Sequence, residues 1–240
     1  MQVIDPTRGP KPRPENLVEQ IYARLKEDIF EFRLIPGDRF SEGEVAERMQ
    51  VSRTPVRQAL HRLEREGYLD VLFRSGWQVR PFDFKHFEQL YDVRIVFEME
   101  AVRRLCERPE GELPVQLAAL REVWHVPVEQ RREDGREVSR LDEHFHCQLV
   151  EAAGNTEMAR LHAQVSEQIR IIRRLDFTQA QRVHLTYEEH ASILQAILDR
   201  RSDAAQQQLR AHIEVSKAQV HTITLHMLQS TRERATAGGA

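Results

Sequence analysis

The sequence predicts a mainly α-helical protein with two domains, and three observations lead to this prediction. Apolar residues recur every three or four positions through most of the 240 residues, which is the period of an amphipathic helix. Two short runs of strand-like composition stand together within residues 68–79. From residue 83 onward almost every segment is helical by period, so we place the domain boundary near residue 82.

The first domain is expected to begin with an arm and two helices. Residues 1–15 hold four prolines among charged side chains, a composition that favours a disordered arm. A helix is expected over residues 16–32, and the turn at residues 35–38 ends it. The Ser-Glu-Gly-Glu run at residues 41–44 has the form of a capping box, which begins a short helix that reaches Met49.

A third helix and a hairpin complete this domain. The helix is expected over residues 52–66, with a hydroxyl residue as its N-cap and Gly67 at its end. Strand-like runs then flank a turn at residues 74–76. Three helices followed by a hairpin form the order of a winged helix-turn-helix, which we assign to residues 16–82.

The second domain is expected to be an all-α antiparallel bundle over residues 83–228, followed by a flexible tail at residues 229–240. Its six candidate helices cover residues 83–108, 112–132 with a break at Pro127, 136–153, 155–176, 178–200 and 202–228. A bundle of this length can bury a core of its own.

The composition excludes several classes of protein. The 35 Lys and Arg residues against 38 Asp and Glu residues give a net charge of −3. No run approaches the roughly 18 uncharged apolar residues of a membrane span, and the N-terminus lacks the apolar core of a signal peptide. Cys106 and Cys147 cannot form a disulfide framework and fit a reducing compartment. We therefore expect a cytoplasmic protein rather than a membrane, secreted or disordered one.

The charge is unevenly distributed along the chain. Residues 48–80 carry seven arginines against three acids, so this segment is +4 in a chain of net charge −3. A small basic surface on an acidic protein indicates a localised anionic partner. The alternative is an ordinary solvated helix face.

The helix at residues 52–66 has an outer face suited to DNA. Val56, Leu60 and Leu63 form its apolar stripe. Its polar residues at the start and on the outer face are Ser52, Arg53, Thr54 and Arg57. The N-terminus of a helix favours phosphate, and an arginine can contact O6 and N7 of one guanine together. The alternative is a helical module without a role in DNA binding.

Residues 51–67, with the sequence VSRTPVRQALHRLEREG, resemble the GntR family of bacterial transcription regulators. The Ile-Pro-Gly turn at residues 35–37 and the Ser-Glu pair at residues 41–42 belong to the same pattern. The resemblance implies a winged helix-turn-helix that binds double-stranded operator DNA. The residues that it assigns to the operator contacts are Ser52, Arg53, Thr54 and Arg57, with Arg74, Ser75 and Gly76 forming the wing.

Three positions depart from the family pattern. Gln50 stands where many members have a glycine in the turn between helices, and Gln58 replaces a common glutamate. Gly43 stands where some members place a basic DNA contact. We expect that contact to be missing.

Four residues of the second domain indicate a metal centre. Asp142 and His146 are four residues apart and so share one helix face, beside an apolar stripe that turns them inward. His190 and His212 stand among the apolar positions of two other helices. Three imidazoles and a carboxylate in one core are costly unless they are paired or coordinated. This set suits zinc, or alternatively nickel, manganese or iron, and the other alternative is ordinary buried histidines.

The second domain resembles the FCD ligand domain of the FadR-type GntR regulators. The matching features are the DEHFH run at residues 142–146, the AAGN break at 152–155, His190 with the apolar residues after it, and His212. The resemblance implies a homodimer and carries the family's Asp/His/His/His metal tetrad over to Asp142, His146, His190 and His212. Six helices are closer to the shorter VanR-like branch than to the seven-helix branch.

Arg94 is a candidate for effector binding. It lies among apolar residues on the face that we expect to be buried, where an unpaired guanidinium would be expensive. By the resemblance, the arginine of the motif from Arg94 to Glu98 holds a ligand carboxylate. The alternative is an internal salt bridge with Glu98 or Asp142.

Together these features predict a transcription regulator rather than an enzyme. A small carboxylate metabolite would bind at one divalent transition metal per chain and change the affinity for the operator. One alternative is a regulator for which the metal itself is the signal. A second is a helical-bundle metalloenzyme, suggested by the Glu-x-x-His spacing at Glu122/His125 and Glu143/His146, although Pro127 disrupts the helix of the first pair.

Overall fold

The structure is a computed structural model that describes residues 14–73, 76–109, 114–223 and 225–237. The chain forms two compact units, one of residues 1–82 together with 225–240 and the other of residues 83–224. The described part is mainly α-helical, with one small antiparallel sheet, so the predicted fold class is confirmed. The predicted disordered arm lies outside the described residues except for its last two, which begin the first helix.

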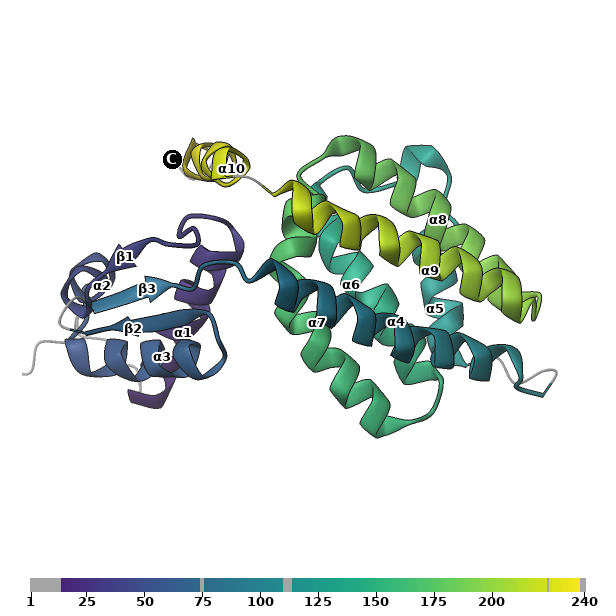
Figure 1. The fold of residues 1–240 in the computed structure, drawn as a ribbon, viewed down its shortest axis with the longest axis horizontal. Helices are drawn as coiled ribbons and strands as arrows, with labels where there is room; N and C mark the ends of the chain where they lie inside the picture. The colour runs from purple at the N-terminus through teal and green to yellow at the C-terminus, as the bar shows by residue number, and fades with distance from the viewer. Residues whose placement is uncertain (1–13, 74–75, 110–113, 224, 238–240) are drawn as a thin grey trace, which may run out of the picture. The chain divides into compact units, whose positions relative to one another are not determined.

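The first unit consists of helices packed beside a three-stranded sheet (Figure 1). The helices that precede β2 and β3 in the chain are α1 (Pro14–Phe30), α2 (Glu42–Met49) and α3 (Arg53–Arg65). Its strands are β1 (Arg39–Phe40), β2 (Leu69–Leu72) and β3 (Gly76–Val79). The strands are antiparallel in the order β1-β3-β2, so β3 is central, and Asp70 and Arg39 both pair with Gln78.

Local sequence signals explain these helices. The capping box at the start of α2 is present: the Ser41 hydroxyl accepts from the Glu44 N–H at 3.2 Å, and the Glu44 carboxylate accepts from the Ser41 N–H at 2.6 Å. The predicted apolar stripe of α3 is fully buried, and α3 packs against α1. Burial of this stripe fixes which face of α3 remains exposed.

Two tight turns need residues with left-handed backbone. Gln50, in the turn between α2 and α3, has φ of +54°, the conformation for which a glycine is favoured at this position. Gly76 has φ of +92°, and a Cβ at this residue would lie 2.6 Å from the carbonyl oxygen of Phe40. Glycine is therefore required where β3 approaches β1.

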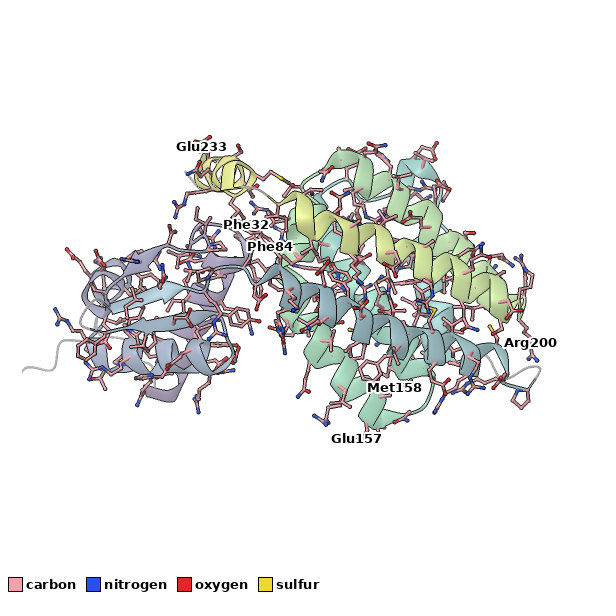
Figure 2. The ribbon with its side chains drawn as sticks, in the orientation of Figure 1. Phe32, Phe84, Glu157, Met158, Arg200 and Glu233 are labelled. Carbon is pink, nitrogen blue, oxygen red and sulfur yellow. The ribbon has the colours of Figure 1, made fainter. Side chains whose placement is uncertain are left out.

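The second unit is a bundle of helices (Figure 1). Its α-helices are α4 (Phe84–Cys106), α5 (Val115–Trp124), α6 (Gly135–Ala152), α7 (Thr156–Asp176), α8 (Ala180–Leu198) and α9 (Ser202–Gln219), with 3₁₀ turns η1 (Val128–Gln130) and η2 (Val220–Thr222). Helix α4 packs against α6, α7, α8 and α9. In Figure 2, Glu157 and Met158 mark the start of α7, and Arg200 marks the turn between α8 and α9.

Aromatic rings fill one part of the bundle core. The ring centroid of Trp124 lies 5.8 Å from that of Phe145, 4.9 Å from that of Tyr187 and 4.2 Å from that of His190. All four side chains are buried. These contacts join α5, α6 and α8, and they set the wall against which His190 lies.

The break expected at Pro127 is present, since α5 ends at Trp124 and Pro127 is the N-cap of η1. Two other segments differ from the prediction. The helix expected over residues 202–228 is interrupted, because α9 ends at Gln219, η2 follows it, and α10 begins at Leu225. The expected tail at residues 229–240 is instead helical as far as Ala237, within α10 (Leu225–Ala237) of the first unit. Leu228, in the first turn of this helix, is buried. None of the helices in the described part of the chain is long and apolar enough to cross a membrane.

Gly135 provides a test of the bundle packing. A Cβ at this position would lie 2.1 Å from the backbone carbonyl oxygen of Phe177, which cannot rotate away as a side chain can. We expect Gly135→Ala to lower the free energy of unfolding by about 1–3 kcal/mol, as overpacking does. Urea unfolding should show this loss, while Arg140→Ala, at an exposed position of the same helix, should change stability by less than about 0.5 kcal/mol. Equal midpoints for the two variants would contradict the close approach.

Candidate metal centre and nucleic-acid interface

Four predicted DNA-contacting residues lie together at the N-terminal end of α3. Ser52 is its N-cap, Arg53 is its first residue, and Thr54 and Arg57 follow within two turns. All four are exposed, while Val56 between them is fully buried. The structure therefore presents these side chains on one exposed end of the helix.

The predicted wing residues are only partly described. Arg74 and Ser75 lie outside the described residues. Gly76 is half-buried and begins β3. Its close approach to Phe40 gives it a role in shaping the hairpin.

Two adjacent residues of α2, Glu42 and Gly43, lie beside arginines of α3. Arg57 forms a two-bond contact with Glu42, with 2.9 Å from Nε to Oε1 and 2.8 Å from Nη2 to Oε2. A Cβ on Gly43 would lie 3.2 Å from Nη2 of Arg53. The missing side chain at residue 43 thus leaves space that the Arg53 guanidinium approaches.

The metal tetrad predicted from the sequence is brought together in the bundle. Asp142 and His146 come from α6, His190 from α8 and His212 from α9, and all four are buried. One ligand atom from each lies within 4.8 Å of the other three. Convergence from three helices shows that this group is a feature of the tertiary fold.

The ligand atoms have the separations of a coordination shell. Nε2 of His212 lies 3.2 Å from Nε2 of His146 and 3.2 Å from Nε2 of His190. Oδ1 of Asp142 lies 3.3 Å from His190 Nε2, 3.6 Å from His146 Nε2 and 3.7 Å from His212 Nε2. Ligands at about 2.0–2.1 Å from a tetrahedral zinc ion are separated by about 3.3 Å. These five separations and the donor types of the residues present therefore fit a transition-metal ion.

Two outer carboxylates determine which histidine nitrogens face the centre. His146 Nδ1 lies 2.6 Å from Oε2 of Glu98, and His212 Nδ1 lies 2.6 Å from Oε2 of Glu189. A neutral histidine that donates from Nδ1 carries a lone pair on Nε2. The 3.2 Å contact between these two Nε2 atoms then has no proton to share, and a cation between them would resolve it.

Each outer carboxylate is held by a buried arginine. Arg94 Nε donates to Oε1 of Glu98 at 2.6 Å, and Arg182 Nη1 donates to Oε2 of Glu189 at 2.7 Å. Glu98 is fully buried and also receives His162, whose Nε2 lies 3.0 Å from Oε1. Two Arg–Glu–His chains therefore orient two of the histidines.

Arg94 forms the internal salt bridge that was one of its two predicted roles, yet it is not fully satisfied. Its Nη2 is buried and has no hydrogen-bond partner among the described residues. Arg173 is similar, since its Nε donates to Oδ2 of Asp142 at 2.8 Å while its buried Nη2 also lacks such a partner. Oδ1 of Asp142 is likewise without a hydrogen-bond partner there.

The pKa shifts follow from burial and from these contacts. Burial opposes ionisation of both Glu98 and Asp142. The pKa of Glu98 is nevertheless held well below its usual range by Arg94 and His146. The pKa of Asp142 is likewise held well below its usual range by His146. Burial lowers the pKa of His146 and lowers that of His190 well below its usual range. The carboxylates are therefore charged at neutral pH and both imidazoles are neutral, as metal ligands must be.

Glu189, Arg182 and His162 were not predicted from the sequence. His162 had no partner that the sequence could indicate, because Glu98 lies 64 positions away. Glu189 directly precedes His190 in sequence, yet its carboxylate serves His212 of the next helix. No local pattern reveals such contacts between helices.

The low pKa of His190 predicts how stability depends on pH. In the unfolded chain His190 titrates near pH 6.5, whereas in the folded chain its pKa is lower, so below about pH 6.5 the unfolded chain binds more protons. Its contribution to stability is thus complete above pH 6.5 and is lost as the pH falls.

We expect urea unfolding of chelator-treated protein between pH 8 and pH 5 to show this loss, at up to about 1.4 kcal/mol per pH unit from His190. His190→Phe should make the slope shallower, because it removes the imidazole that titrates. The variant should still fold, since a phenyl ring can stack on Phe145 as the imidazole does, at 3.7 Å between centroids. His144→Gln, at an exposed position of α6, is the control and should leave the slope unchanged. A slope for His190→Phe equal to that of the wild type would refute the assignment.

Comparison with protein-family models gives two matches. Residues 17–79 match the model "Bacterial regulatory proteins, gntR family", and residues 89–215 match the model "FCD domain". The first covers α1–α3 and the sheet, and the second covers most of the bundle.

Individual relatives agree with these matches. The chain is 35% identical over 179 residues to the Nta operon transcriptional regulator of Aminobacter aminovorans, which is 75% of this chain and 82% of that protein. It is 30% identical over 209 residues to the HTH-type transcriptional regulator YdhC of Bacillus subtilis (strain 168), covering 87% and 92% of the two chains.

A solved structure shares the fold. A GntR transcriptional regulator from Rhodococcus sp. RHA1 superposes with a TM-score of 0.67 over 87% of this chain and 99% of that chain, at 23% identity. The relatives and the family models are those of DNA-binding transcription regulators and not of enzymes. The chain therefore belongs to the GntR family of bacterial transcription regulators, with an FCD domain as its second unit.

Proposed function

We propose that this regulator binds operator DNA under the control of a small organic acid that binds at a metal centre in the FCD domain. The observation that carries the proposal is the convergence of the four ligand atoms, in which Nε2 of His146 and Nε2 of His212 lie 3.2 Å apart while each ring's Nδ1 faces a carboxylate. One divalent cation bound between the two Nε2 atoms would remove their mutual repulsion and would also be a partner for Oδ1 of Asp142.

The donor set supports one divalent transition metal per chain, with zinc as our first choice and nickel, manganese or iron as alternatives. Three imidazoles and one carboxylate are borderline ligands that suit these ions better than calcium or magnesium. When bound, the metal supplies positive charge and open coordination positions for an anionic ligand. The protein contributes the orientation, through Glu98 and Glu189.

Two buried guanidinium groups support the proposal that a small organic acid binds in the bundle. Arg94 and Arg173 each use one edge on an internal carboxylate and keep a buried Nη2 without an acceptor among the described residues. Buried N–H groups are rarely left unpaired, so a ligand that brings acceptor oxygens is favoured. A small carboxylate metabolite meets this need beside the metal ligands.

We propose that the protein binds DNA as a homodimer in the cytoplasm. Because a homodimer has two-fold symmetry, its operator is expected to be pseudo-palindromic. The proposed contacts are Ser52, Arg53, Thr54 and Arg57, with the wing at Arg74, Ser75 and Gly76. The exposed cluster at the start of α3 supports the first four. The acid would change operator affinity because it binds the states of high and low DNA affinity unequally. Six α-helices in the described part of the bundle support the VanR-like branch.

The second candidate function is a regulator that senses the metal itself. The closed set of outer contacts around His212, in which Glu189 and Arg182 are both engaged, favours tight metal binding without a further ligand. The two candidates differ in whether an acid or the metal alone changes operator affinity.

The outer carboxylate of His212 offers a direct test of the metal centre. We expect Glu189→Gln to weaken zinc binding about 10- to 100-fold, because the amide is a poorer acceptor for the His212 N–H and leaves Arg182 less compensated. Competition with a chromophoric chelator would measure this. Glu188→Gln is the matched control, since this neighbouring acid is exposed and pairs with Arg131, and its zinc affinity should be unchanged. Equal affinities for the two variants would argue against zinc at the tetrad.

The binding of an organic acid can be tested by thermal unfolding of zinc-loaded and of chelator-treated protein, each with acetate, succinate or citrate added. We expect at least one acid to raise the transition temperature of the loaded protein alone, because a ligand stabilises the state that it binds. Arg94→Lys, which retains the charge beside Glu98 but loses the guanidinium fork, should abolish the response to the acid and keep the response to zinc.

Retention of the acid response in Arg94→Lys would remove Arg94 from the proposed site. If none of the acids acts and zinc alone changes the mobility of the protein's own upstream DNA in a gel, the second candidate function is correct.

A further inference from the structure

Glu42 occupies a rigid position at the start of α2. It is the first residue of the helix, directly after the N-cap Ser41, whose capping box fixes the turn. The side chain of Glu42 is 21% exposed, so the adjacent structure restricts its rotamers. An acid at this place stands beside the end of α3 that carries the proposed DNA contacts.

Glu42 links α2 to α3. Its two carboxylate oxygens accept from Nε and Nη2 of Arg57 on α3, at 2.9 and 2.8 Å. These contacts with Arg57 above all lower the pKa of the Glu42 carboxyl. The acid is the less exposed partner, and the arginine is the part that extends to solvent, at 61% side-chain exposure.

The contact leaves a defined part of the guanidinium available. The bonds to Glu42 use the edge formed by Nε and one N–H of Nη2. The opposite end, formed by Nη1 and the second N–H of Nη2, presents two parallel donors. Two parallel donors match O6 and N7 of guanine in the major groove. The pairing therefore selects the end-on orientation of Arg57 and blocks the side-on one.

A purely electrostatic view gives the opposite expectation for this acid. A carboxylate close to the phosphate backbone repels DNA, so its charge lowers affinity for every sequence. An exposed ion pair also contributes little to folding stability. What the pair does provide is a restricted, pre-oriented arginine, which favours recognition of one base over general attraction.

We propose that Glu42 is a positioning residue for base recognition, which holds Arg57 end-on for a guanine. This inference rests on the proposed operator contact of Arg57. It assigns sequence discrimination to a residue of α2 that need not touch the DNA. It also implies that loss of the negative charge improves general DNA affinity while it worsens discrimination.

The test uses the full chain and duplex DNA. The wild-type protein first enriches duplexes from a random 30-base-pair pool, and its affinity is then measured for the selected duplex and for copies with single guanine replacements. Glu42→Gln, Arg57→Ala and the control Glu47→Gln are compared on the same duplexes. Glu47 is an exposed acid of α2, so its replacement removes the same charge without altering the contact with Arg57.

We expect Glu42→Gln to lose about 10-fold in discrimination at the same guanine that Arg57→Ala ceases to recognise, and to bind unrelated duplex at least as tightly as the wild type. Glu47→Gln should keep full discrimination. Thermal unfolding should show all three variants to be folded, because Glu42→Gln keeps the shape of the side chain and the side chains of Arg57 and Glu47 are exposed.

Two results would overturn the inference, and they are distinguishable. If Arg57→Ala keeps every guanine preference, the proposed contact of Arg57 is wrong and the role of Glu42 falls with it. If Arg57→Ala loses a preference that Glu42→Gln retains, the contact of Arg57 stands and the positioning role of Glu42 alone is refuted.

Discussion

The bundle depends on the compensation of carboxylates that have no access to water. Glu98 and Asp142 are buried, and isolated charges in such a place would be prohibitively costly. Glu98 is compensated by Arg94, His146 and His162, which come from three helices. Because each partner must reach the same oxygens, the compensation fixes the mutual position of α4, α6 and α7, and with it the orientation of the tetrad.

The same type of contact, an arginine held by a glutamate, serves different purposes in the two units. In the bundle the Arg94–Glu98 pair is fully buried, so loss of either partner would leave an uncompensated charge. On the surface the Arg57–Glu42 pair is partly hydrated, and its effect on stability is small. The buried pair contributes to the fold, whereas the exposed pair contributes orientation.

The sequence was sufficient for the features that depend on local periodicity. The stripe of Val56, Leu60 and Leu63 and the four-residue spacing of Asp142 and His146 are properties of a single helix, so they could be predicted. The role of Glu189 could not, since it depends on how α8 lies beside α9. The helical state of residues 229–237 was also missed, because this segment belongs to a compact unit whose other part is more than 140 residues earlier in the chain.

The ring contacts in the bundle core have a practical consequence. The chain has two tryptophans, and each unit contains one of them. Trp124 lies edge-on to His190 in the tetrad, while Trp77 lies edge-on to His61 of α3, the helix that carries Arg57. Indole emission changes with its immediate electrostatic surroundings, so the protein carries one tryptophan beside the buried tetrad and one beside α3. Single Trp→Phe replacements would separate the two signals and allow events in either unit to be followed without an attached dye.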